Sequence, residues 1–247
     1  MATLPQLDSF SEIADRSQEI LAYVKEFPLK DHVYYFPNNL PDRRQMASEG
    51  EVIDGTGILK YGNVQNAVFA GSSALYYIQC RIDRNYTASS RRWEAHDADL
   101  FILNQPVENR LCTGIVDLVQ TRDKTVEELL LNFDLGCCRA AFDPQMNLWI
   151  SIQCMAAVFG HHYPLPNYMK NKKSFGYILM KHRHGEDYHN AEHFMFDRLQ
   201  ERIRKYSDRG FGVTWIETDE VIPWIKNRFH YSEWLRKMAT NGHENKD

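Results

Sequence analysis

Short apolar runs separated by polar turns dominate the first two thirds of the chain. Such runs are typical of buried strands, whereas apolar residues recurring every three or four positions indicate helices. The pattern predicts strands at 67–70, 100–103, 114–119 and 137–142, helices at 9–27, 125–131 and 192–206, and a strand running into a helix at 148–159. Residues 28–63 are rich in Pro, Asn and Asp and predict loops and short pieces.

Two helix ends have sequence signals of their own. Ser9 and Glu12 have the spacing of a capping box at the start of the helix at 9–27. Gly210 follows the helix at 192–206, as expected of a glycine near a helix C-terminus. Both signals favour packed helices around a central set of strands.

Carboxylates interrupt the apolar runs at Asp97, Asp99 and Asp117. An ionised group among apolar neighbours is costly unless it is paired or bound to a metal. Alternate residues of a strand project to the same face, so Asp97 and Asp99 are expected to point together. The polar, proline-containing loop at 104–109 predicts a hairpin, which would fold back antiparallel and place Asp117 opposite Asp99.

Three such carboxylates are expected to hold a divalent cation. Two carboxylates about 4 Å apart repel by roughly 4 kcal/mol at an effective dielectric constant near 20. A magnesium or manganese ion removes that penalty and prefers oxygen ligands. The alternative is that these aspartates cap turns at strand ends.

Gly71, Ser72 and Ser73 follow the strand at 67–70 and precede a predicted helix. The amides and dipole of a helix N-terminus favour phosphate, and the serine hydroxyls add possible phosphate contacts. The same serines would also serve as helix caps, and the two interpretations are compatible.

These motifs together resemble the nucleotidyltransferase superfamily of the DNA polymerase beta type. The resemblance covers roughly residues 64–212 and is nearest to an uncharacterised group found in fungi and large DNA viruses. Its motifs are the Gly-Ser turn, a Trp before Asp-x-Asp-x-Phe, a Phe-Asp-Leu-x-x-Cys-like segment and a Lys-Tyr-x-x-Arg-Gly-Phe stretch; here they correspond to Gly71-Ser72-Ser73, Trp93, Asp97–Phe101, Phe133–Cys137 and Lys205–Phe211.

The resemblance implies an α/β or α+β fold with a mixed sheet and with N- and C-terminal helical additions. It implies that Asp97, Asp99 and Asp117 are catalytic residues holding two Mg²⁺ or Mn²⁺ ions, and that the Gly-Ser turn contacts a nucleoside triphosphate such as ATP. The expected reaction transfers a nucleoside monophosphate to a hydroxyl of an RNA, a protein or a small molecule. The polar insertion at 81–94 departs from the family pattern, and so does Ala74, where members have a glycine soon after the turn.

Residues 170–209 are locally basic in a chain whose formal net charge is −4. A cationic patch beside a carboxylate site suits a polyanionic substrate. Lys205 and Arg209 are the candidate phosphate contacts. His189 and His193 share a helix face but lack the Glu of the zinc-protease motif, which disfavours zinc.

The rest of the sequence bounds the class of protein. The five cysteines are scattered and lie mostly in apolar segments, which is typical of reduced thiols. No signal-like start and no membrane-length apolar run is present, so we expect a cytoplasmic or nuclear protein that is not secreted and does not use a membrane. The expected organisation is helix and loops at 1–63, the transferase core at 64–212, and a helical segment with a disordered tail at 213–247. The alternative function is a catalytically inactive binding protein with the same fold.

Overall fold

The structure is a computed structural model, and it describes the following parts of the chain: residues 1–37, 66–82, 93, 98–106, 109–112, 116–143, 145, 147–166 and 201–216. The chain divides into two compact units, of which one comprises Met1–Pro164 with Glu201–Thr214 and the other Leu165–Gln200 with Trp215–Asp247. Nearly all of the described residues belong to the first unit, and the fold below is the fold of that unit.

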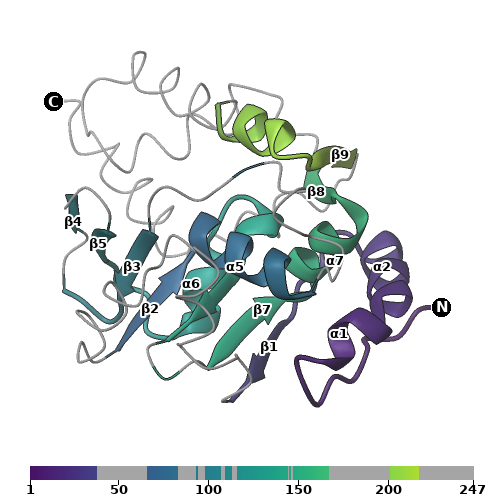
Figure 1. The fold of residues 1–247 in the computed structure, drawn as a ribbon, viewed down its shortest axis with the longest axis horizontal. Helices are drawn as coiled ribbons and strands as arrows, with labels where there is room; N and C mark the ends of the chain where they lie inside the picture. The colour runs from purple at the N-terminus through teal and green to yellow at the C-terminus, as the bar shows by residue number, and fades with distance from the viewer. Residues whose placement is uncertain are drawn as a thin grey trace, which may run out of the picture. The chain divides into compact units, whose positions relative to one another are not determined.

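A seven-stranded sheet forms the centre of the described part of the chain (Figure 1). Its strands are β1 (Val33–Phe36), β2 (Ala67–Ala70), β3 (Ala98–Ile102), β4 (Asn109–Cys112), β5 (Val116–Gln120), β6 (Ala140–Phe142) and β7 (Leu148–Ser151). Their order across the sheet is β1-β7-β6-β2-β3-β5-β4. Every neighbouring pair is antiparallel except β3 and β5, which are parallel. The sheet is therefore mixed, and the α+β class expected from the sequence is confirmed.

Helices cover this sheet, and a small second sheet follows it. The helical elements are α1 (Glu12–Asp15), α2 (Ser17–Glu26), α5 (Ser72–Ile82), α6 (Val126–Leu131), α7 (Ile152–Gly160) and the 3-10 helix η1 (Gly136–Cys138). Residues 201–208 are also helical. The second sheet pairs β8 (His162–Pro166) with β9 (Gly212–Ile216).

The alternation of side chains divides the large sheet into two faces. On one face, α6 packs through Leu129 and Leu130 against β2, β6 and the neighbouring strands, forming a cluster with Val68, Ala70 and Ala141. On the other face, Phe69 stacks on Phe142 with ring centroids 5.5 Å apart, and Tyr77 of α5 contacts the same Phe142. Because Asp99 pairs with Ala70 in the sheet register, its side chain belongs to the α6 face.

Several expected elements are found where the sequence placed them. The strand running into a helix at 148–159 is β7 followed by α7, and Ser151 caps that helix by accepting from the Cys154 amide at 3.1 Å. The helix at 125–131 is α6, with Thr125 as its N-cap. The helical residues 201–208 are followed by a turn at Gly210. The φ of Gly210 is +91°, as expected of a glycine just after a helix C-terminus.

Other expectations were wrong. The helix predicted at 9–27 is broken at Arg16, which has the non-helical ψ of 17° and separates α1 from α2. Ser9 bonds the Glu12 carboxylate at 2.9 Å, but the residue before α1 is Ser11, so the capping box does not form as expected. The loop prediction at 28–63 missed β1, whose four residues pair with β7.

The strand predicted at 137–142 also begins later than expected. Residues Gly136–Cys138 form η1, and only Ala140–Phe142 belong to a strand. The side chain of Gln153 explains why glycine begins this turn, because a Cβ added to Gly136 would lie 2.6 Å from its Oε1 atom. The turn therefore depends on close packing between Gly136 and α7, which the apolar pattern of the segment cannot predict.

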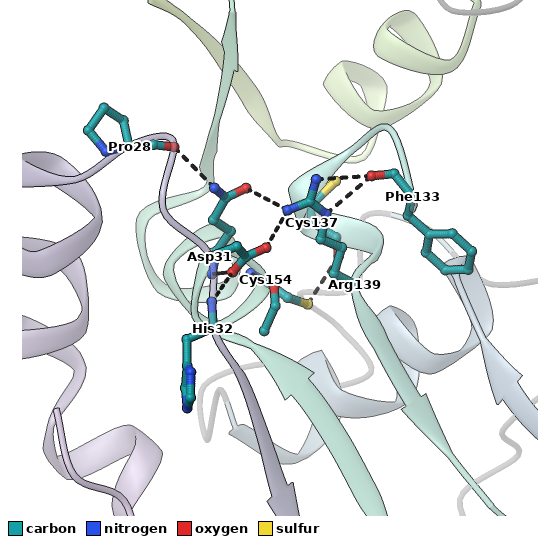
Figure 2. Close-up of polar contacts among 9 residues, drawn as sticks. Pro28, Asp31, His32, Phe133, Cys137, Arg139 and Cys154 are labelled. Atoms are coloured by element: carbon teal, nitrogen blue, oxygen red, sulfur yellow. Dashed lines mark hydrogen bonds and ion pairs between the residues drawn. The ribbon is translucent and has the colours of Figure 1, made fainter. Parts of the chain in front are cut away.

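A buried ion pair ties the N-terminal segment to the sheet (Figure 2). Arg139 donates to the Asp31 carboxylate, and the two side chains are 2% and 5% exposed. Arg139 also donates to the carbonyl of Phe133 through two nitrogens, each at 3.1 Å, and Asp31 accepts from the amide of Gln153 at 3.3 Å. Gln153 in turn donates to the carbonyl of Pro28 at 3.0 Å. Each charged group is thus paired and further hydrogen-bonded, as a buried charge requires.

Some expectations concern residues outside the described ranges. Asp97, residues 83–92 and 94 of the insertion at 81–94, His189 and His193 fall there, as do most of the basic stretch and the C-terminal segment after Ile216. Among the described residues, no helix is both long and apolar enough to cross a membrane.

Candidate active site

Asp99 and Asp117 are direct neighbours across two strands. They occupy matching positions in the register of β3 and β5, and Ala70 of β2 lies on the other side of Asp99. The sequence predicted this proximity, but it predicted an antiparallel hairpin. The hairpin is instead formed by β4 and β5, because the chain leaving β3 passes to the far side of β5 before it turns back. Asp117 therefore approaches Asp99 on a parallel strand.

A guanidinium group joins the two carboxylates. Arg110 on β4 places its Nη2 atom 2.9 Å from Oδ1 of Asp99 and in contact with Oδ2 of Asp117, while its Nε atom donates to that same Asp117 oxygen at 3.1 Å. Since one nitrogen contacts both carboxylates, the two acceptor oxygens lie within about 6 Å, twice a hydrogen-bond length. The sequence reasoning missed Arg110; its spacing of seven residues before Asp117 carries no recognised signal.

The two carboxylates are more enclosed than the arginine. The side chains of Asp99 and Asp117 are 22% and 13% exposed, whereas the Arg110 side chain is 52% exposed. On the same face of the sheet, Phe101, two residues along β3 from Asp99, packs against Phe133 with ring centroids 5.5 Å apart. Partial burial strengthens the electrostatic interactions of the pair relative to bulk water.

The turn from β2 into α5 lies against the same carboxylate. A Cβ added to Gly71 would lie 3.8 Å from Oδ2 of Asp99, and the φ of Gly71 is +82°. The hydroxyl of Ser73 is buried and turns back to donate to the Ala70 carbonyl at 3.5 Å, which fits a structural role for this serine. Ser72 is half-buried at the first position of α5. The first amides of a helix have no partner within the helix, so the N-terminus of α5 is the place where the expected phosphate contacts would have to lie.

Arg209 is part of an aromatic cluster. Its guanidinium carbon lies 4.0 Å from the Trp93 ring centroid and 5.0 Å from that of Tyr206, and Trp93 makes an edge contact with Tyr76 of α5. Arg209 and Trp93 are each 9% exposed. The Nη1 atom of Arg209 and the Nε1 atom of Trp93 are buried and have no hydrogen-bond partner among the described residues. The cluster thus connects two motifs of the family resemblance, Trp93 and the basic Lys205–Phe211 stretch, with the helix that follows the Gly-Ser turn.

The remaining candidates lie on or near the same helical segment. Lys205 is exposed within the helical residues 201–208. Asp134 forms an ion pair of 2.6 Å with Arg202 of that segment. Cys137 and Cys138 are buried beside each other with sulfur atoms 3.9 Å apart, and burial raises the pKa of the Cys137 thiol. The Asp134–Arg202 ion pair attaches the segment to the residues just before η1.

The residues present fit a divalent cation. The donors are carboxylate oxygens only, which is the ligand set that Mg²⁺ and Mn²⁺ prefer. Two oxygen ligands of one Mg²⁺ ion are roughly 3–4 Å apart. This separation is compatible with the upper limit of about 6 Å that the shared Arg110 contact sets for the two carboxylate oxygens. Among the described residues no group of three potential metal ligands is found, and Asp97, the expected third carboxylate, lies outside them. The fit therefore rests on Asp99 and Asp117.

Comparisons of the chain with protein-family models, with curated proteins and with solved structures found no match.

Proposed function

We propose that this protein is a metal-dependent nucleotidyltransferase of the polymerase beta-type fold. The observation that carries the proposal is the direct pairing of Asp99 with Asp117 on parallel strands, with the Gly71 turn and the start of α5 against the same carboxylate. Two carboxylates that can ligate a metal, next to a helix N-terminus that favours anions, suit a ligand that combines a divalent metal with phosphate. Only the Asp97 position is additionally required to complete the expected three-carboxylate set.

The proposed reaction joins an acceptor hydroxyl to the α-phosphorus of a nucleoside triphosphate. A new oxygen–phosphorus bond forms, the bond between the α-phosphorus and the bridging oxygen breaks, and pyrophosphate leaves. Bound Mg²⁺ or Mn²⁺ would lower the pKa of the attacking hydroxyl and neutralise charge on the leaving group. Asp99 and Asp117 would hold the metal, with Asp117 nearer the hydroxyl. The amides after Gly71 would bind the triphosphate, assisted by Ser72 and by Lys205 and Arg209.

One observation favours the second candidate, a nucleotide-binding or interaction protein that has lost catalysis. Arg110 already supplies a positive charge to both carboxylates, so the pair is neutralised in part without a metal. A protein that no longer uses metal would be expected to keep such an arrangement. The two candidates differ in whether metal binding depends on Asp99 and Asp117.

The deciding experiment is calorimetric titration of ATP, GTP, CTP and UTP in the presence of Mg²⁺ or Mn²⁺. It compares the wild type with Asp99→Asn and with Glu127→Gln, a control that removes one negative charge from an exposed position of α6. The proposal expects metal-dependent nucleotide binding that Asp99→Asn reduces at least tenfold and Glu127→Gln preserves. Turnover is then tested by measuring pyrophosphate release. Each nucleotide is incubated with the protein and a mixed pool of RNA and small hydroxyl acceptors.

Each contrary result has its own meaning. Nucleotide binding that is equally tight without metal, and unaffected by Asp99→Asn, would favour the non-catalytic candidate. Full metal-dependent turnover by Asp99→Asn would show that the site is elsewhere.

A further inference from the structure

Arg110 lies where a cation bridging the two carboxylates would lie. Its Nη2 atom contacts one oxygen of Asp99 and one of Asp117, so a single positively charged group interacts with both acids. A metal ion held by both Asp99 and Asp117 would share these carboxylates with the guanidinium and would lie close to its positive charge. The guanidinium and the metal therefore compete for the same two acids.

The exposure of the three side chains makes the arginine the part that can leave. The carboxylates are 22% and 13% exposed and sit on two central strands, whereas Arg110 is 52% exposed. Arg110 belongs to β4, the terminal strand of the sheet, which pairs with β5 on one side. A half-exposed side chain on an edge strand returns to solvent without opening the core, while moving either aspartate would disturb β3 or β5.

We propose that Arg110 is an internal counter-cation that competes with the divalent metal for Asp99 and Asp117. It reduces repulsion between the carboxylates when no metal is bound, and its charge opposes the binding of a metal ion to the same carboxylates. Arg110 would thus set the metal concentration at which the site fills. This inference rests on the metal site of the proposed function.

The test measures binding of Mn²⁺ alone, without nucleotide, from the loss of the free-ion electron paramagnetic resonance signal. It compares the wild type with Arg110→Gln, which replaces the guanidinium by a shorter, uncharged polar group, and with Arg110→Lys, which keeps the charge but loses the forked geometry. The matched control is Arg122→Gln, an exposed arginine just after β5. Thermal melting without metal verifies that each variant is folded.

The expected result is that Arg110→Gln binds Mn²⁺ about fivefold or more tightly than the wild type, which is at the lower end of the typical coupling between two interacting groups. Arg122→Gln should bind as the wild type does, and Arg110→Lys should lie between the two. If the wild type binds Mn²⁺ and Arg110→Gln binds it equally or more weakly, the competition is refuted while the metal site of the proposed function stands. If no folded variant binds Mn²⁺, both the competition and the metal site are refuted.

Discussion

Gly71 and Asp99 meet at the point where β2 ends and β3 begins. A Cβ added to Gly71 would lie 3.8 Å from Oδ2 of Asp99 and 3.9 Å from the Phe133 ring, so a methyl group would fit there. The constraint at this position is the backbone, since Gly71 has a φ of +82°. This conformation lets the strand turn directly into α5 beside the carboxylate.

Substitution of Gly71 separates backbone strain from crowding. Gly71→Ala should destabilise the protein by about 1–2 kcal/mol, the cost of a left-handed conformation for a residue with a Cβ. Gly71→Asn should cost less, because asparagine adopts this conformation more readily. Urea unfolding of the two variants makes the comparison. An equal loss in both would mean that contact with Asp99 or Phe133, rather than φ, sets the requirement for glycine.

The buried pair of Asp31 and Arg139 should be among the most sensitive polar contacts in the described fold. Asp31→Asn or Arg139→Met leaves the other charge buried and uncompensated, and we expect each to lower the free energy of unfolding by about 3–5 kcal/mol. The double variant Asp31→Leu with Arg139→Met should be more stable than either single variant, because no unpaired charge remains. Equilibrium unfolding in urea measures all three.

A second ion pair provides the control for this prediction. Arg16 and Glu19 interact on α2 and its N-cap, with side chains that are 32% and 55% exposed. Arg16→Gln should change stability little, because exposed pairs are screened by water and salt. A similar loss from Arg16→Gln and Arg139→Met would contradict the role assigned to burial.

Tyr34 should make stability fall at high pH. Burial raises the pKa of its phenol to about 12 from the ordinary 10, and its hydroxyl donates to the Pro5 carbonyl at 2.7 Å. A raised pKa in the folded state favours the neutral phenol. The resulting stabilisation is complete below pH 10 and is lost as the pH rises toward 12.

The Tyr34 prediction is tested by the slope of stability against pH. Tyr34→Phe should be less stable than the wild type at pH 8 and should lose stability less steeply between pH 10 and 11. Tyr35→Phe, which removes the 50% exposed phenol next along β1, should keep the wild-type slope. Urea midpoints at these pH values give the answer, and identical slopes in all three proteins would refute the assignment.

Arg209 and Trp93 should be energetically coupled. A guanidinium over an indole ring contributes about 0.5–2 kcal/mol, with the larger values at desolvated sites. A double-mutant cycle with Arg209→Gln and Trp93→Leu should give a coupling free energy in this range, measured by thermal or urea unfolding. Additive losses would show that the two residues support the fold independently.

Local sequence signals predicted the positions of helices and strands better than they predicted how the strands pair in the sheet. The apolar run ending at Gly71 and the Thr125 cap are local features, and β2, α5 and α6 appear where these features placed them. The parallel pairing of β3 with β5 is not local, because it depends on β4 occupying the outer position. Asp99 and Asp117 can be neighbours in either a parallel or an antiparallel pair of strands. The sequence therefore predicted the right neighbours although it predicted the wrong strand direction.

Two parts of the site had no signal of their own in the sequence. Arg110 occurs in a short polar edge strand, and surface strands tolerate arginine without any functional reason. The pairing of Asp134 with Arg202 joins residues 68 apart in the chain, and no sequence pattern distinguishes this arginine from the other basic residues of its region. Contacts between distant segments depend on tertiary packing, and the periodicity within one segment carries no information about them.

The place of β1 in the sheet has a consequence for synthesis and folding. Val33 pairs with Ser151, so β1 finds its partner only after β7 has been synthesised. Asp31 likewise pairs with Arg139, more than a hundred residues later. Contacts between such distant residues slow folding, because the loop between them must close first. β1 is therefore expected to be the last strand to join the sheet, and a nascent chain released before residue 151 would carry an unpaired aromatic strand.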